Sequence, residues 1–276
     1  MPLYQAILLA LVQALTEFLP ISSTAHLFLV GWLFGWGDSG LGFAIAVHAG
    51  SLLGVLAYFW RTWVRLLRAV LRRPATEHTA EAAADRKLFW LLVLGTVPAA
   101  LAGLLLEEYV ATVFRSERLM AATLIGFGLL LGWADRVGQR RRQMQSLDTT
   151  DALLIGVAQA VALVPGVSRS GFTITTGLLR GLTREAAARF TFLLSTPIIA
   201  GATLLHVLEW RHAPPNHAEL TALLAGALVS ALASFLVIKY FLRFLQTQSL
   251  KVFVYYRIVF GIVILLLSFL QTGSAR

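Results

Sequence analysis

The chain has 276 residues, of which 58% are hydrophobic and 13% charged, and its mean hydropathy is +0.75. Soluble domains carry about 25% charged residues, so this composition excludes an ordinary globular protein and indicates helices that cross a membrane. The chain contains no cysteine, which excludes disulfides and thiolate chemistry.

The first polar feature along the chain is the segment QALTEFLPISSTAH at residues 13–26, in which Pro20 interrupts an apolar run. The pieces on either side of the break, 1–19 and 22–35, are short for a membrane span, which needs about 20 residues. We therefore expect a re-entrant helical hairpin over 1–35 that enters and leaves the membrane on one side. Non-helical backbone at that depth is tolerated only where protein or water surrounds it.

This first hairpin carries residues suited to catalysis. Gln13 and Glu17 lie four residues apart and hence on one helix face, and their amide and carboxylate oxygens suit Mg²⁺ or Ca²⁺. A hydrogen-bonded interhelical pair would explain Gln13 alone, but an unpaired carboxylate is costly in a membrane. After the proline, Ser22 is placed to cap the next helix, and Ser23 and His26 share a face in its first turn. A hydroxyl beside an imidazole, with a carboxylate on the previous helix, is the arrangement that nucleophilic catalysis needs.

Basic residues alternate between the loops that join the longer apolar stretches. Six stretches are each long enough to span a bilayer: 42–60, 88–106, 119–134, 187–208, 219–242 and 252–270. Together, 15 Lys and Arg residues fall in the segments 61–87, 135–148 and 239–257, whereas 107–118 and 209–219 hold 3. The positive-inside rule places the three basic segments in the cytoplasm. The net charge of +9 thus indicates orientation and not a nucleic-acid partner.

The second interrupted segment, QAVALVPGVSRSGFT, predicts another re-entrant hairpin over 151–182. Ser168 follows the Pro-Gly turn as the cap of a new helix, Arg169 starts that helix, and Thr173 lies one turn on. A guanidinium, hydroxyls and a helix N-terminus each favour a phosphate oxygen. The alternative is that Arg169 pairs with Glu17 as a structural bridge.

The two halves of the chain each contain one hairpin and three spans. Three crossings is an odd number, so the second half, 148–270, must be inverted relative to the first, 1–137. We predict an all-α polytopic membrane protein with a single membrane domain over 1–276. Its architecture is an inverted-topology repeat of two halves, each a re-entrant helical hairpin plus three transmembrane helices, and the two interrupted elements meet near the midplane. The parity of the crossings puts both termini outside the cytoplasm, and we expect the site to open to the periplasmic side.

The strings QALTEFLPISSTAH and PGVSRSGFT resemble the two signature motifs of the bacterial undecaprenyl pyrophosphate phosphatases, the bacitracin-resistance family. The resemblance extends over essentially the whole chain. It implies a phosphatase of the bacterial inner membrane that hydrolyses undecaprenyl pyrophosphate to undecaprenyl phosphate and phosphate. The reaction recycles the lipid carrier for cell-wall synthesis, and the family uses a divalent cation, Mg²⁺ or Ca²⁺.

Carried over residue by residue, the resemblance implies catalytic roles for Ser23, His26 and Glu17, without settling whether Ser23 or His26 attacks phosphorus. It implies metal binding by Glu17 and Gln13. Many members carry glutamate where this chain has Gln13, so Glu17 would carry most of the metal binding. The pyrophosphate would be held by the second motif together with the serine after the first proline turn: Ser168, Arg169, Ser170, Thr173 and Ser22.

Other functions share this frame. Secondary transporters also use inverted repeats and bind anions at broken helices. The set Glu17, Ser23 and His26 favours a phosphatase, because transport needs binding groups but no nucleophile beside a base. A flippase for the product lipid is a narrower alternative, which the sequence leaves open as a second activity, and the oligomeric state is left open too. Lipid phosphatases related to acid phosphatases expect a histidine six residues after the arginine of their Ser-Arg motif; Thr175 stands there, so that class is excluded.

Overall fold

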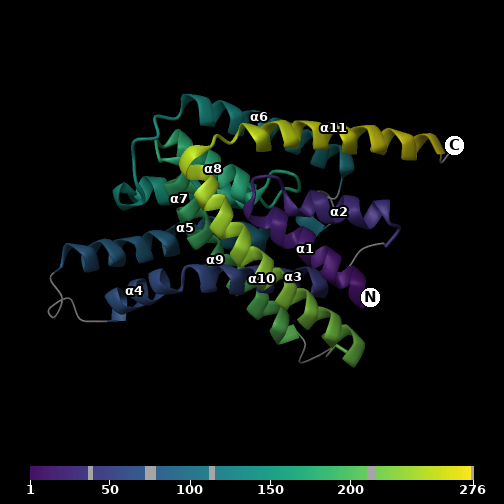
Figure 1. The fold of residues 1–276 in the computed structure, drawn as a ribbon, viewed down its shortest axis with the longest axis horizontal. Helices are drawn as coiled ribbons and strands as arrows, with labels where there is room; N and C mark the ends of the chain where they lie inside the picture. The colour runs from purple at the N-terminus through teal and green to yellow at the C-terminus, as the bar shows by residue number, and fades with distance from the viewer. Residues whose placement is uncertain (37–39, 72–78, 112–115, 210–214, 275–276) are drawn as a thin grey trace.

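The structure, a computed structural model, describes residues 1–36, 40–71, 79–111, 116–209 and 215–274, which form a bundle of helices (Figure 1). In chain order the elements are α1 (Leu3–Phe18), α2 (Ser23–Leu33), α3 (Leu41–Tyr58), α4 (Trp60–Leu71), α5 (Ala80–Ala111), α6 (Glu117–Val137), the short 3-10 helix η2 (Met144–Ser146), α7 (Thr149–Val161), α8 (Arg169–Leu179), α9 (Arg184–Glu209), α10 (His217–Thr247) and α11 (Lys251–Ser274). Extended pairing within these ranges is limited to one isolated bridge, between Arg142 and Leu182. The predicted all-α fold is confirmed.

Long apolar helices account for the membrane spans. Six helices of the described part of the chain are long and apolar enough to cross a membrane: α3, α5, α6, α9, α10 and α11. They coincide with the six apolar stretches of the sequence, so the multi-pass membrane fold is confirmed.

The remaining apolar helices form the two expected hairpins. The helices α1 and α2 have 16 and 11 residues, and α7 and α8 have 13 and 11. Near the start of α1, Tyr4 makes an edge-on ring contact with Trp36, just beyond the end of α2. At the start of α7, Asp151 accepts a hydrogen bond from Arg180, just beyond the end of α8, over 2.6 Å. In each hairpin the second helix therefore returns to the level at which the first began.

The turns of both hairpins are buried and share an unusual backbone conformation. Pro20 to Ser22 in the first turn and Pro165 to Ser168 in the second are all buried. Ser22 has φ 72° and ψ 98°, and Ser168 has φ 70° and ψ 112°. Non-glycine residues rarely adopt positive φ, and such strain is concentrated at functional sites. The same backbone conformation at Ser22 and Ser168 is what two copies of one repeat would have. The arrangement of 1–137 and 148–270 as inverted repeats stays a prediction.

Close packing of α3 against α10 positions the first hairpin. An added Cβ at Gly50 would lie 2.2 Å from the carbonyl oxygen of Ala227, so only glycine allows this approach. The approach brings the Ser51 and Ser230 hydroxyls to 3.0 Å. The helix α1 is then seated on both helices through a small apolar core: Ala6, Leu9, Ala10, Phe43, Val47, Ala222 and Leu223.

The basic end of the molecule lies opposite the N-terminus. Figure 1 shows α4 and the junction of α10 with α11 at this end. Here Asp151 accepts hydrogen bonds from Arg142 over 2.6 Å and from Arg180. Burial by itself raises the pKa of the Asp151 carboxyl, but these two guanidinium groups outweigh it and hold the pKa below its ordinary value. The cluster fixes the open end of the second hairpin.

One basic residue of the charge pattern, Arg257, is fully buried. The prediction that Arg257 belongs to a cytoplasmic basic segment is wrong, because it lies about two turns into α11 and is 0% exposed. A single arginine at the edge of an apolar stretch looks the same in the sequence whether it faces the cytoplasm or the protein interior. The other basic residues of 239–257, Lys239, Arg243 and Lys251, are exposed.

Candidate active site at the two hairpin turns

The two buried turns lie against each other. Ser170, in the first turn of α8, donates a hydrogen bond to the carbonyl oxygen of Leu19 over 2.9 Å. The two broken helices therefore meet directly at the point where each is interrupted.

The Glu17 carboxylate is the centre of this meeting point. One oxygen, Oε1, contacts the Arg169 guanidinium, which comes from the second hairpin. The other, Oε2, accepts hydrogen bonds from Gln13 Nε2 over 2.9 Å and from Ser23 Oγ over 2.7 Å. His48 Nε2 of α3 lies 3.6 Å from the same oxygen. The sequence left open whether Arg169 pairs with Glu17, and in the structure it does.

Ser23 and His26 share the first turn of α2, but their polar atoms have different partners. Ser23 donates to Glu17, as described. His26 Nδ1 lies 2.7 Å from the carbonyl oxygen of Ser22 and Nε2 lies 2.6 Å from the Tyr256 hydroxyl. A carbonyl only accepts, so Nδ1 carries the hydrogen, and in the neutral ring Tyr256 donates to Nε2. The base nearest to the Ser23 hydroxyl is therefore Glu17, where the sequence pattern suggested His26.

The hydroxyls of the second motif mostly bond within the protein. Ser168 caps α8 by accepting from the backbone N–H of Gly171 over 3.1 Å. Thr173 donates to the Arg169 carbonyl oxygen over 2.7 Å and accepts from Thr191 over 3.0 Å. Their role in binding pyrophosphate, like that of Ser170, stays a prediction.

In the first motif, Ser22 occupies the N-cap position of α2, but its side chain makes no capping hydrogen bond. Its backbone carbonyl orients His26 instead. Its part in binding pyrophosphate also stays a prediction.

Part of the cluster is exposed at the surface of the protein. The side chain of His48 is 36% exposed and that of Arg169 is 19% exposed. Ser23 is half-buried, and its neighbour Thr24 is exposed. A phosphate group can therefore approach Ser23 and Arg169, whereas Glu17 lies beneath them at 7% exposure.

Three residues at the turns were missed from the sequence. His48 is a polar residue in an apolar span, which the cost of such residues in a membrane could have singled out. Tyr256 and Arg257 come from α11 and meet the hairpins only through the tertiary fold. Nothing in the local sequence distinguishes that tyrosine from an interfacial aromatic residue.

Glu17 and Gln13 supply the oxygen atoms that could bind the expected divalent cation. Gln13 Oε1 is buried and has no hydrogen-bond partner among the described residues. No group of three or more His, Asp or Glu side chains suited to a metal occurs in the described ranges. Mg²⁺ is often held by one or two carboxylates together with the phosphates of the substrate. The pair Glu17 and Gln13 fits a cation held in that way, with substrate oxygens completing the shell.

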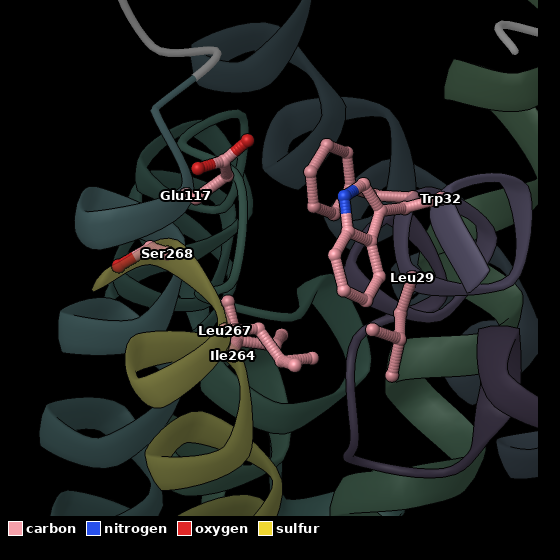
Figure 2. Close-up of a pocket in the computed structure, with 7 residues that line it drawn as sticks. Leu29, Trp32, Glu117, Ile264, Leu267 and Ser268 are labelled. Atoms are coloured by element: carbon pink, nitrogen blue, oxygen red, sulfur yellow. The ribbon is translucent and has the colours of Figure 1, made fainter. Parts of the chain in front are cut away.

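A small pocket lies between α2, α6 and α11. Figure 2 shows Leu29 and Trp32 of α2 facing Ile264 and Leu267 of α11 across it, with Glu117 near one end. On the same two helices, the His26 ring stacks on Phe260 with centroids 4.3 Å apart. Phe260 of this stack lies one helical turn from Ile264, so the pocket is close to the site along α2 and α11, although no residue of the site lines it.

The amino-acid sequence is similar to those of known proteins over nearly its whole length. Residues 6–263 match the family described as bacitracin resistance protein BacA. The chain is 46% identical over 271 residues to the undecaprenyl-diphosphatase of Moorella thermoacetica, covering 98% of this chain and 100% of that protein. It is 46% identical to that of Pelotomaculum thermopropionicum, with 97% of each chain covered, and 47% identical to that of Thioalkalivibrio sulfidiphilus, with 97% and 99% covered. The chain belongs to the BacA bacitracin resistance family.

Proposed function

We propose that this protein is an undecaprenyl-diphosphatase, which hydrolyses undecaprenyl pyrophosphate to undecaprenyl phosphate and phosphate. The observation that carries the proposal is the cluster of Glu17, Ser23 and Arg169 at the meeting point of two broken helices. It combines a nucleophile, a base and a phosphate-binding cation inside a membrane protein. The relatives named undecaprenyl-diphosphatase match over nearly their full length, which supports the same activity here.

The terminal phosphate is bound by Arg169 and the N-terminal end of α8. In the absence of substrate the guanidinium contacts Glu17, so a pyrophosphate must compete with this carboxylate. The competition is favourable, because a pyrophosphate carries more negative charge than one carboxylate and accepts from a guanidinium in a bidentate manner. Substrate binding thereby frees Glu17 Oε1 while Oε2 keeps its hydrogen bond to Ser23.

Ser23 is the nucleophile that we favour. Its Oγ attacks the terminal phosphorus and gives its proton to Glu17. The bond from that phosphorus to the bridging oxygen breaks, and the bridging oxygen leaves with undecaprenyl phosphate. Water then attacks the phosphoserine and releases phosphate, while Glu17 returns the proton to Ser23 Oγ. Arg169 stabilises the charge on the transferring oxygens.

His26 is the rival nucleophile. Its Nε2 already bonds Tyr256, and this bond must break before the ring can attack phosphorus. That requirement favours a second role, in which His26 and Tyr256 orient the lipid phosphate or protonate it as it leaves. An attack by His26 would give a phosphohistidine, so the two routes differ in the intermediate that can be trapped.

A divalent cation, Mg²⁺ or Ca²⁺, would be held by Glu17, with Gln13 Oε1 as a weaker donor. When bound, it would supply positive charge to the phosphate oxygens. Gln13 Nε2 faces Glu17 in the structure, so metal binding through Oε1 needs the amide to rotate.

The lipid chain of the substrate would follow the pocket between α2 and α11. Most of the side chains that line the pocket are apolar, and the His26–Phe260 stack lies one helical turn from Ile264. One extended substrate could therefore place its phosphate at Ser23 and its prenyl chain beside Leu29 and Ile264.

In the cell, the protein would lie in the inner membrane and open to the periplasm. The basic end of the bundle would face the cytoplasm, and the pocket, which lies near Glu117 at the start of α6, would face outward. Dephosphorylation there returns the lipid carrier for cell-wall synthesis. The description of the family as bacitracin resistance protein supports a role of this protein in bacitracin resistance.

Phosphate release from undecaprenyl pyrophosphate by the purified protein, with and without chelator, tests the function. We expect release in the presence of a divalent cation and loss of release in chelator. A transporter or a flippase alone would move the lipid in vesicles without releasing phosphate, so absence of phosphate from an intact, folded preparation would contradict the proposal.

A further inference from the structure

We propose that Arg257 is a positioning residue that holds the two hairpin turns at a fixed separation, so that Ser23 and Arg169 act on one phosphate. The proposal rests on the phosphatase function proposed above and assigns a role to a residue outside both sequence motifs. Arg257 is 0% exposed and cannot contact the substrate. Its contribution must therefore pass through the groups that it binds.

The guanidinium of Arg257 joins the two turns through their backbone. Its Nη1 donates to the carbonyl oxygen of Pro20 in the first turn over 3.3 Å. Its Nη2 donates to the carbonyl oxygens of Gly166 and Val167 in the second turn over 3.0 and 2.9 Å. One planar group thus spans both interruptions.

The same side chain is fastened to a third element. Arg257 Nε donates to the carbonyl oxygen of Leu124 in α6 over 3.1 Å. A neighbouring residue of α6, Thr123, donates to the carbonyl oxygen of Pro165 over 2.6 Å. The turns are therefore held against a membrane-spanning helix as well as against each other.

Free backbone carbonyls explain why a cation is needed at this position. A broken helix inside a membrane leaves carbonyl groups without partners, and each unpaired group is costly there. Among the described residues Arg257 has no carboxylate partner, and all of its hydrogen bonds go to backbone carbonyls, those of Pro20, Gly166 and Val167 in the turns and those of Thr123 and Leu124 in α6. Burying a guanidinium without a carboxylate partner costs free energy. The hydrogen bonds that it gives to otherwise unpaired carbonyls offset this cost.

Two glycines make room for this side chain. A Cβ at Gly128 of α6 would lie 3.1 Å from Arg257 Cβ and 3.4 Å from its Nε. A Cβ at Gly171 of α8 would lie 2.6 Å from Nη1. The space around Arg257 is thus fitted to an arginine from both hairpin and span.

The separation of the two turns matters for catalysis, because the reacting groups come from different turns. Ser23 follows the turn at Pro20, and Arg169 follows the turn at Gly166. A misplacement of about 1 Å between groups that act on one phosphate can cost about 10²-fold in rate. Lysine keeps the charge but lacks the planar fork, so it cannot bond both turns and α6 together.

Two variants test the role, and each has a control. Arg257→Lys removes the fork, and Arg184→Lys is its control, because Arg184 is a half-buried arginine away from the turns. Its Nε donates to the Asp135 carboxylate over 2.5 Å. Gly128→Ala displaces Arg257 without replacing it, in case Arg257→Lys does not fold. Its control on the same helix is Gly126→Ala, whose added Cβ would meet nothing within 4 Å.

Two readouts are needed. We expect Arg257→Lys to lower kcat about 10²-fold with little change in KM, and Gly128→Ala to act in the same direction. Nitroxide labels on cysteines at Leu15 of α1 and Leu179 of α8, both exposed, report the separation of the hairpins by double electron–electron resonance. The distance distribution should broaden in Arg257→Lys and Gly128→Ala and stay narrow in Arg184→Lys and Gly126→Ala.

The outcomes separate the proposals. A normal kcat in Arg257→Lys, a loss confined to KM, or a loss of kcat with an unchanged distance distribution would each overturn the positioning role. If the wild-type protein releases no phosphate, the proposed function fails, but the distance measurement still decides whether Arg257 holds the turns.

Discussion

Ser23 Oγ donates its hydrogen to Glu17 Oε2 over 2.7 Å, across the turn that separates α2 from α1. The carboxylate that receives this hydrogen also contacts Arg169 of the second hairpin. The proposed nucleophile, base and phosphate-binding group are therefore connected to one another in the structure. These connections make the effects of single substitutions predictable.

Replacing Ser23 with alanine is expected to lower kcat by orders of magnitude, because the attacking oxygen is lost. The fold should be kept, since Ser23 is only half-buried and makes one side-chain hydrogen bond. Phosphate release at saturating substrate measures the effect. Thr24→Ala, an exposed neighbour, is the control and should retain wild-type activity.

The trapped intermediate distinguishes Ser23 from His26 in the same experiment. Rapid quenching with substrate labelled at the terminal phosphate should leave protein-bound label that survives acid, as phosphoserine does. Label that is lost in acid but kept in base would identify phosphohistidine. That result, or substantial turnover by Ser23→Ala, would move the nucleophile to His26.

Replacing Arg169 with lysine is expected to lower kcat by about 10²–10³-fold, because the charge remains but the bidentate contact with phosphate is lost. Thermal stability should change little, since an ammonium can still pair with Glu17. Arg180→Lys is the matched control: Arg180 lies just beyond the other end of α8 and pairs with Asp151. Near wild-type phosphate release by Arg169→Lys would assign the arginine to structure alone.

Local sequence signals were enough to predict much of this site. Each proline break with the hydroxyls after it is contained in about 14 residues, so the hairpins and the identities of Glu17, Ser23 and Arg169 could be inferred. The spans followed from length and hydropathy, which depend on no tertiary contact.

The pairing of the side chains could not be inferred in the same way. Ser23 and His26 share a helix face, but the direction of the Ser23 hydroxyl depends on how the turn places α1 beside α2. His26 and its partner Tyr256 are 230 residues apart in the chain. Arg257 was predicted to lie in a loop because the sequence shows only its charge and its place at the edge of an apolar stretch. Its burial depends on the packing of α6, α11 and both turns, which the local sequence does not show.

Gln13 provides a prediction about the cation. Gln13→Glu adds a second carboxylate beside Glu17 and should lower the divalent-ion concentration for half activity by about tenfold, which is about 1.4 kcal/mol of binding free energy. Glu17→Gln should nearly abolish activity. The control Gln5→Glu makes the same charge change about two turns away on α1 and should leave the metal requirement unchanged. Activity of Glu17→Gln that persists in excess chelator would remove the metal from the mechanism.

The orientation in the membrane can be tested with introduced cysteines, since the chain has none of its own. Ala80 at the start of α5 and Ala218 at the start of α10 are both exposed. In intact cells an impermeant thiol reagent should label a cysteine at position 218 and not one at position 80, if the basic segments face the cytoplasm as the positive-inside rule predicts. The opposite pattern would invert the topology and place the site on the cytoplasmic side.

The pocket between α2 and α11 predicts how activity depends on the length of the prenyl chain. Leu29→Trp and Ile264→Trp would fill the pocket shown in Figure 2 from its two sides. KM for undecaprenyl pyrophosphate should rise, because the indole rings occupy the space that the prenyl chain would fill. KM for farnesyl pyrophosphate, whose chain is far shorter, should change much less.

Leu266→Trp is the control: Leu266 lies between two pocket residues on α11 but is 60% exposed, so its replacement should change KM for neither substrate. An equal rise in KM for both substrates would mean that the fillers disturb the phosphate site, and no rise for either would exclude this pocket as the path of the chain.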